Sequence, residues 1–469
     1  MGDSTKKQTE VQTEIYKEKC CVGCPDSGKG CRLSCVKLKE ETKDKTPRPV
    51  MDIARDAEKL FSTYEITKGE LARVKELEER LQSGHMTVSV IGQFKRGKST
   101  LVNAILGDKI LPVGIVPVTA VVTSIKYGDK AATVRFNNGV IKEIQFDQMA
   151  MYINEQENND NHLGVSQVEI YSPAPFLKSG ITLVDTPGVG SVHQKNSDAA
   201  YAYVKESDAV VFMLSVDSPI NQIEIDFLEN AKEFAAKFYF AVNKVDIIDE
   251  EDLEDYLAYC RNLIAKLLSV STDKVQLFPV SAKKGTGIQE LKTAMEKDWG
   301  QATQAILEES AHLKMRDVVE SALSQVSLYR TALSMPMEEF DEKFGQMDKE
   351  FSSIIRETKE LSKDISGKAA LEETHINDVK NRLSQKIMEL FGIEYHYELS
   401  TVDYFRGNVG ESGEDSIVSA VEGLCRQLRD VLNAIFMHKE ENAYVVCRRI
   451  NDLNRLVRKL VKLRQELAD

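Results

Sequence analysis

The chain has 469 residues, of which 42% are apolar and 29% carry a charge. This length exceeds one ordinary domain and predicts roughly two to four domains. The net charge of −13 argues against a protein whose main task is to bind nucleic acid, so no nucleic-acid partner is expected. No apolar run approaches the roughly 18 residues that cross a bilayer, and the polar N-terminus has no signal-peptide core. We therefore expect a cytoplasmic protein, or alternatively one at the periphery of the inner membrane.

A cysteine-rich segment occupies residues 1–47. Five of the eight cysteines lie within residues 20–35. In a reducing compartment such a cluster forms free thiols or metal ligands more often than disulfides. Four thiolates suit tetrahedral Zn²⁺ or an iron–sulfur cluster, and they are supplied here by Cys21, Cys24, Cys31 and Cys35. The alternative is a disordered tail or a redox-labile thiol cluster, because the spacing matches no standard ligand signature.

A helical pattern follows between residues 48 and 86. Apolar residues recur at three- and four-residue spacing from Ile53 to Leu81, which is typical of one face of a helix. Gly84 stands where a helix of this kind would end. We expect this segment to pack on a helical bundle that forms later in the chain.

Residues 87–299 have a different texture, in which short β-branched runs alternate with helical stretches. The runs are TVSVI (87–91), ITLVD (181–185), AVVFML (209–214), FYFAV (238–242) and QLFPV (276–280). Strands that alternate with helices predict a mostly parallel, doubly wound sheet with helices on both faces. The expected fold class of this domain is therefore α/β.

Strand signals vanish in residues 300–469, which predict an all-α trunk. An apolar stripe runs along Phe340–Ile365 and continues, after a break at Gly367, as far as Leu390. A second helical stretch begins at Ile417. Two such arms predict a helical hairpin, bundle or coiled coil with arms of about 75 Å each if unbroken.

Two parts of this trunk are candidates for membrane contact. The loop at 398–416 is the expected tip of the hairpin, but it carries several acids and no long apolar run, so its membrane signal is weak. The final helix carries seven Lys/Arg and one acid between Val445 and Arg464, a composition that attracts anionic lipid. A bundle seam with a solvated basic face is the favoured alternative.

The stretch GQFKRGKS (92–99) follows the first predicted strand and precedes a helix, which is the context of a phosphate-binding loop. Backbone N–H groups of such a loop converge on phosphate oxygens, and the helix N-terminus adds partial positive charge. Lys98 is expected to reach the β- and γ-phosphates, and the Ser99 hydroxyl to bind Mg²⁺. The predicted nucleotide contacts of this loop are Gly92, Gln93, Phe94, Lys95, Arg96, Gly97, Lys98, Ser99 and Thr100.

Three further motifs, DTPG, NKVD and SAK, each follow a predicted strand. Asp185 is expected to hold Mg²⁺ and Gly188 to meet the γ-phosphate, while Thr119 supplies a second hydroxyl to the metal. Asp246 can accept both donors of the guanine edge; adenine lacks that pair, which disfavours it by ~10⁴-fold or more. The other predicted nucleotide contacts are Asn243, Lys244, Ser281, Ala282 and Lys283.

Each motif alone is compatible with an ordinary turn, but four of them in this order favour a guanine-nucleotide site at one rim of the sheet. The motifs are similar to those of the GTPase superfamily, and residues 91–128 resemble the opening of bacterial dynamin-like proteins. The shared feature is the LP-x-G-x-x-P-x-TA run around Thr119. The resemblance is strong over residues 88–290 and only architectural elsewhere.

The resemblance implies a dynamin-like GTPase that hydrolyses GTP with Mg²⁺ and releases GDP. It implies a homodimer through the GTPase faces, and a helical trunk that moves against membrane lipids to remodel them. Lys98, Thr119 and Lys95 would be the catalytic residues. Alternatively, the chain is a non-mechanical regulatory or assembly switch whose helices recruit a protein, such as a second dynamin-like subunit. A third reading is a structural interaction protein that binds nucleotide without useful turnover.

Two departures from the family pattern bear on the chemistry. Eukaryotic dynamins tend to carry Gln-Ser where this chain has Phe94 and Lys95, and that serine is thought to bind a monovalent cation. The Lys95 ammonium either replaces the cation or faces solvent, and the second reading is favoured. Val189 stands where Ras-like proteins have a glutamine that orients water. The resemblance implies that backbone groups around Thr119 place the water, with slow turnover until two GTPase faces meet.

Overall fold

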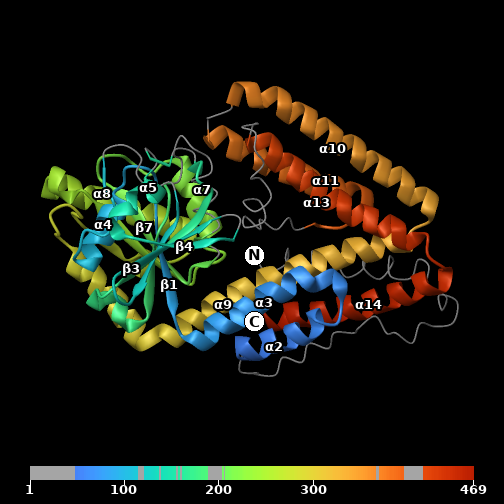
Figure 1. The fold of residues 1–469 in the computed structure, drawn as a ribbon, viewed down its shortest axis with the longest axis horizontal. Coiled ribbons are helices and arrows are strands. Elements are labelled where there is room, and N and C mark those ends of the chain that lie inside the picture. Colours follow the sequence, from blue (N-terminus) through green and yellow to red (C-terminus); the bar gives the residue numbers. More distant parts are fainter. Residues whose placement is uncertain are drawn as a thin grey trace.

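The computed structural model shows a sheet-containing domain beside two groups of helices (Figure 1). The residues it describes are 48–114, 121–136, 139–154, 157–158, 161–188, 203–204, 206–365, 369–395 and 416–468. The cysteines of residues 20–35, Thr119 and all but the last residue of the expected tip loop lie outside this part of the chain. The predictions made for them therefore stay predictions.

Nine strands form one sheet in the order β4-β3-β5-β2-β6-β1-β7-β8-β9. Their bounds are Met86–Ile91 (β1), Thr123–Tyr127 (β2), Ala131–Phe136 (β3), Ile141–Ile144 (β4), Val165–Ser172 (β5), Ile181–Asp185 (β6), Ala209–Ser215 (β7), Lys237–Asn243 (β8) and Leu277–Pro279 (β9). The five strands from β6 to β9 in this order are mutually parallel. Each of them contains or overlaps a predicted run, and the α/β class is confirmed.

The other half of the sheet was not predicted. β3 is antiparallel to both β4 and β5, and β2 is parallel to β5 but antiparallel to β6. The sheet is therefore mixed. This extension places Asp185 opposite Thr123 of β2, and the Asp185 side chain is buried. The end of β6 thus lies within the sheet, between β1 and β2.

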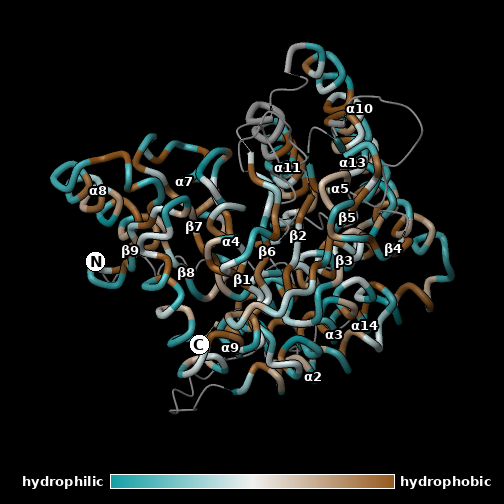
Figure 2. The backbone as a smooth tube through the Cα atoms, turned by 60° about the vertical axis from the view of Figure 1, so that its left-hand side comes forward, coloured by the Kyte–Doolittle hydropathy of each residue, from teal (hydrophilic) through white to brown (hydrophobic). Residues whose placement is uncertain are grey.

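Helices cover both faces of the sheet and form a separate core on each. One core packs α4 (Lys98–Leu106), α5 (Ala150–Ile153) and the start of α9 (Ile288–Ser334) against the strands. The other packs α7 (Gln222–Ala231) and α8 (Glu250–Leu268). Figure 2 shows brown, hydrophobic stretches along the central strands and alternating colours along the helices, as two-sided burial and one-sided burial require. The short 3-10 helices are Glu65–Thr67, Phe146–Gln148, Pro175–Ser179, Val245–Ile247 and Thr272–Lys274.

The remaining helices share a third core. In one group α2 (Val50–Phe61), α3 (Lys68–Ser83) and α14 (Ala443–Glu466) lie along the C-terminal half of α9. In the other group α10 (Met337–Ile365), α11 (Ala369–Phe391) and α13 (Ser416–Lys439) pack on one another. Because α9 is one helix of 47 residues, the proposed border between residues 299 and 300 falls inside it rather than in a linker.

Two expectations for the helices were wrong in detail. Residues 48–86 form two helices, α2 and α3, that turn back on each other, rather than one; α3 ends at Gly84, whose φ is +63°. The first arm divides into α10 and α11, which lie on either side of the break expected at Gly367, whereas the division of the second arm into α13 and α14 was not predicted. The second arm is therefore shorter than the about 75 Å of an unbroken helix.

The apolar face of α14 is a bundle seam. Its leucines at 453, 456, 460 and 463 are buried in the helical core, whereas Arg455, Arg458, Lys459 and Lys462 are exposed. The basic composition of this helix thus belongs to a solvated face, as the favoured alternative predicted. Among the described helices, none combines the length and the apolar character that a bilayer-spanning segment needs.

Candidate nucleotide site

The phosphate-binding loop connects β1 to α4 and has an unusual backbone. Lys95 has φ +67° and Gly97 has φ +97°. A Cβ at Gly97 would lie 2.5 Å from Nδ2 of Asn243, so only glycine fits this approach without a shift. The loop therefore turns sharply just before the start of α4, where the helix dipole adds positive charge.

Lys98 lies inside this loop, on the first residue of α4. Its Nζ donates hydrogen bonds to the carbonyl oxygens of Gly92 at 3.0 Å and Gln93 at 3.3 Å. Burial lowers the pKa of Lys98 to about 8, and the nearby carboxylates of Asp185 and Glu224 partly oppose that shift. The loop thus holds an ammonium group at the place where phosphate charge would be bound.

Ser99 and Asp185, the two predicted Mg²⁺ ligands within the described residues, are in contact. The Ser99 hydroxyl donates to Oδ2 of Asp185 at 2.6 Å, although the residues are 86 positions apart. Hard oxygen donors of this kind are what Mg²⁺ prefers, so the pair fits the ion. When bound there, Mg²⁺ would neutralise phosphate charge.

Gly188 brings the DTPG motif against the phosphate-binding loop. A Cβ at this position would lie 2.9 Å from Cα of Phe94 and 3.2 Å from Nζ of Lys98. Any side chain would therefore displace the loop or its lysine. This close approach matches the position predicted for a residue whose N–H meets a terminal phosphate.

Asn243 joins three of the predicted motifs. Its Nδ2 donates to the carbonyl of Arg96 at 2.8 Å, and its Oδ1 accepts from the N–H of Ala282 at 3.0 Å. The phosphate-binding loop, NKVD and SAK are thereby fixed relative to one another through one buried side chain.

The SAK motif holds the carboxylate of Asp246 in place. Its Oδ1 accepts from the Ser281 hydroxyl at 2.7 Å, and Nζ of Lys284 lies 3.6 Å from Oδ2. The hydrogen bond from Ser281 lowers the pKa of Asp246. An ionised carboxylate with a fixed direction is the acceptor that the two guanine donors require.

The remaining predicted residues lie at different places. Lys95 is exposed, with its ammonium 5.3 Å from the ring centroid of Phe94, and Lys283 is also exposed. Lys244 has φ +66°, and its Nζ pairs with Asp217 at 2.6 Å. The side chain of Arg96 is buried and directed away from Lys98.

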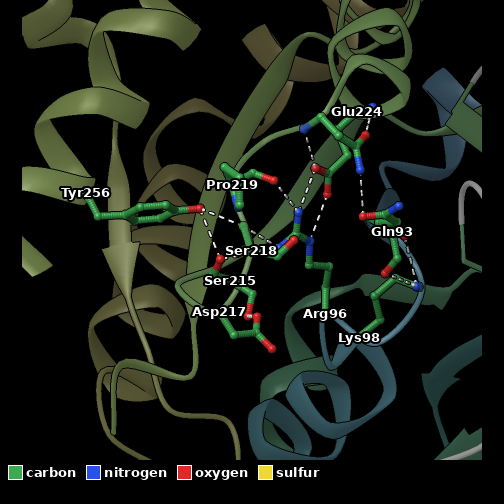
Figure 3. A network of polar contacts seen from close by, with 11 residues as sticks. Gln93, Arg96, Lys98, Ser215, Asp217, Ser218, Pro219, Glu224 and Tyr256 are labelled. Carbon is green, nitrogen blue, oxygen red and sulfur yellow. Dashed lines mark hydrogen bonds and ion pairs between the residues drawn. The ribbon is translucent and has the colours of Figure 1, made fainter. Parts of the chain in front are cut away.

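Sequence reasoning missed the partners of Arg96. Its guanidinium pairs with Glu224 at the start of α7, in a network that Figure 3 shows beside the phosphate-binding loop. The available signal was the pattern Asn221-x-x-Glu224, a capping box. Asn221 Oδ1 accepts from the N–H of Glu224 at 3.1 Å, and Glu224 Oε2 accepts from the N–H of Asn221 at 3.2 Å.

No group of three or more metal-ligating side chains of the His, Cys, Asp and Glu types occurs among the described residues. The three cysteines that the structure describes are free thiols: Cys260 and Cys425 are buried, and Cys447 is exposed. The predicted Zn²⁺ or iron–sulfur ligands of the N-terminal segment lie outside this part, so nothing in the structure supports that cofactor.

The order of the parallel strands and the loops at their carboxyl ends define the class of the protein. A phosphate-binding loop between β1 and α4, a Ser–Asp contact beside it and an NKVD loop at the end of β8 are together the features of a P-loop domain of the GTPase type. Residues 88–246 match the sequence model of the dynamin family. This stretch is thus a dynamin-family domain, and the resemblance found in the sequence is confirmed.

The chain is similar to several known proteins. An uncharacterized protein in the xynA 3' region of Caldicellulosiruptor sp. is 40% identical over 208 residues, which are 44% of this chain and 51% of that protein. The bacterial dynamin-like protein of Nostoc punctiforme is 30% identical, over 41% of this chain and 31% of that protein. A solved oligomerised bacterial dynamin pair has a TM-score of 0.40 and 17% identity, covering 90% of this chain and 81% of that chain. The chain spans about half the length of the first relative and about a third of the second.

Proposed function

We propose that the chain hydrolyses GTP with Mg²⁺ and uses nucleotide-dependent association of its GTPase faces to move its helices against a membrane. The observation that carries this proposal is the contact between Ser99 and Asp185 at 2.6 Å, next to the buried ammonium of Lys98. It supports a site that gathers a metal and phosphates at one point. Asn243 links that point to the carboxylate of Asp246.

The residues divide the work of binding. Lys98 and the loop N–H groups would hold the β- and γ-phosphates, and Ser99 and Asp185 would hold Mg²⁺, which supplies charge neutralisation. Asp246 would select guanine through its two edge donors, with Ser281 keeping the carboxylate oriented. Thr119 would complete the metal site, and backbone groups around it would place the water.

The direct test is phosphate release by the purified full chain with GTP or ATP in the presence of Mg²⁺. We expect release from GTP only, and a fall of at least about 100-fold in the Lys98→Ala variant, because a buried phosphate contact is lost. Glu233→Gln is the control, since this carboxylate lies in an exposed ion pair with Arg316. Equal turnover of ATP, or full activity of Lys98→Ala, would refute the proposal.

The membrane part of the proposal is tested separately. Light scattering should show a dimer with GDP and aluminium fluoride but a monomer with GDP. Sedimentation with vesicles of anionic lipid should then depend on the nucleotide. Dimerisation without any lipid association would favour the alternative function, a regulatory switch whose helices recruit a protein partner, such as a second dynamin-like subunit.

A further inference from the structure

Arg96 has an unusually complete set of partners for a variable position of a phosphate-binding loop. Its Nε and Nη2 donate to the two carboxylate oxygens of Glu224 at 2.9 and 2.7 Å. Its Nη1 donates to the carbonyl of Ser218 at 2.8 Å and that of Ser215 at 3.3 Å, and Nη2 donates to that of Pro219 at 3.2 Å. All five N–H donors of the guanidinium are therefore used.

This pair is removed from solvent. The side chains of Arg96 and Glu224 are 3% and 0% exposed. A bidentate guanidinium–carboxylate pair has one preferred geometry, and in a buried site neither partner has water as a substitute. The position of Arg96 is therefore fixed by the segment between β7 and α7, which Figure 3 shows around the guanidinium.

The backbone of Arg96 links this fixed position to the nucleotide site. Arg96 lies between two residues of positive φ, Lys95 and Gly97, and its carbonyl accepts the hydrogen bond from Asn243. A shift of Arg96 would change the curvature of the phosphate-binding loop. It would also move the side chain of Asn243, which connects this loop to the NKVD and SAK loops.

A second contact runs in parallel from the same segment. Nδ2 of Asn221 donates to Oε1 of Gln93 at 2.8 Å, so both Gln93 and Arg96 of the phosphate-binding loop are held. Tyr256 of α8 supports the segment from the other side, because its hydroxyl donates to the carbonyl of Ser215 at 3.0 Å. We call Asn221 and Glu224 the clamp.

We propose that the clamp is a positioning device for nucleotide binding. Glu224 acts through Arg96, and Asn221 through Gln93, to hold the phosphate-binding loop in a fixed position relative to the NKVD and SAK loops. The inference rests on the proposed function, because it assigns the clamp to the same nucleotide. Neither clamp residue would touch the nucleotide itself. Loss of a clamp residue should therefore weaken the binding of GDP and the binding of GTP by the same factor, and leave kcat nearly unchanged.

The test compares GDP affinity and GTP turnover of the full chain with Glu224→Gln and Arg96→Gln, singly and together. We expect each single variant to raise the GDP Kd and the GTP KM roughly 10- to 100-fold, as small displacements of binding groups do. The double variant should bind GDP no more weakly than Arg96→Gln alone, since the contact with Glu224 is already lost in that variant. Glu233→Gln is the matched control with the same chemical change in an exposed pair.

Each outcome either supports the proposed role of the clamp or contradicts it. Wild-type GDP affinity in both single variants, or additive losses in the double variant, would overturn it. If Glu224→Gln does not fold, Asn221→Ala takes its place and should raise the GDP Kd about 3- to 10-fold, because it removes the partly buried hydrogen bond to Gln93 and the capping bond from the Glu224 N–H. An unchanged Kd would overturn the clamp. Failure of the wild-type chain to bind GDP would instead refute the proposed function.

Discussion

Asp246 shows at the scale of one residue how a carboxylate becomes a selective acceptor. The Ser281 hydroxyl fixes one oxygen, and Lys284 lies near the other without forming a close pair. The carboxylate is held ionised, because the hydrogen bond from Ser281 lowers its pKa.

We expect Asp246→Asn to exchange guanine for xanthine. The amide would present an N–H donor where the guanine donors need an acceptor, whereas xanthine offers an acceptor there. GDP should bind at least about 100-fold more weakly and xanthosine diphosphate more tightly than to the wild-type chain. Titration calorimetry with both nucleotides measures the change. Unchanged preference for guanine would show that Asp246 does not contact the base.

Gly92, Asp185 and Asn243 could be found from sequence because each stands at or just after the end of a buried strand, in a fixed motif. The strands β1, β6 and β8 are short, apolar and β-branched, so the loops behind Ile91, Asp185 and Asn243 could be placed at one rim. The direction of the Arg96 side chain could not be predicted from the sequence. The motif leaves that position free, and the partner on α7 is 128 residues away along the chain.

At the scale of elements, the strands that were missed all carry exposed or half-buried residues. β2 to β5 form the mixed half of the sheet, and β3 and β4 carry exposed or half-buried residues among the buried ones. Their alternation is short and is mixed with lysine, arginine and glutamate, which weakens a periodicity signal. β1 and β7, by contrast, are buried along almost their whole length, so their apolar runs are nearly continuous.

The pairing of α10 with α11 contains a histidine whose charge opposes folding. Nε2 of His375 lies 2.9 Å from the Thr358 hydroxyl, which itself donates to the carbonyl of Ile354. Burial lowers the pKa of His375, although Asp378 and Glu357 favour the charged form. The unfolded chain therefore takes up this proton at a higher pH than the folded chain does.

The helical part should lose stability as the pH falls through about 6.5, the unfolded value of histidine. The loss should level off below the lower pKa of the folded state, where both states are protonated. Urea unfolding followed by far-UV circular dichroism at a series of pH values measures it. His375→Gln should flatten the dependence, whereas His85→Gln, at an exposed position, should not. Parallel profiles for wild type and His375→Gln would contradict the assignment.

The whole molecule is held together where α9 passes from the sheet to the helices. Lys314 on α9 donates to Oδ1 of Asp208 at 3.0 Å, and Ser310 donates to the same oxygen at 2.8 Å. Oδ2 of Asp208 accepts from the N–H of Thr87 at 2.9 Å. Burial lowers the pKa of Lys314 to about 8, partly offset by Asp208. One buried ion pair thus joins the base of the sheet to the bundle.

Removing one member of this pair should uncouple the two parts. Lys314→Met leaves Asp208 buried without its ammonium, and should lower the free energy of unfolding by about 3 kcal/mol. The single tryptophan, Trp299, packs on the core of the sheet domain and reports its unfolding by fluorescence, while circular dichroism follows the helices.

In the wild-type chain both midpoints in urea should coincide, as for one cooperative unit. In Lys314→Met the fluorescence midpoint should fall further, because the buried Asp208 carboxylate lies in the sheet domain and keeps only Arg80, at 3.7 Å, as a charged partner. Arg316→Met, in an exposed pair two residues away, is the control, and Asp208→Asn added to Lys314→Met should restore much of the loss. Midpoints that fall together in Lys314→Met would mean that the pair stabilises the chain without coupling its parts.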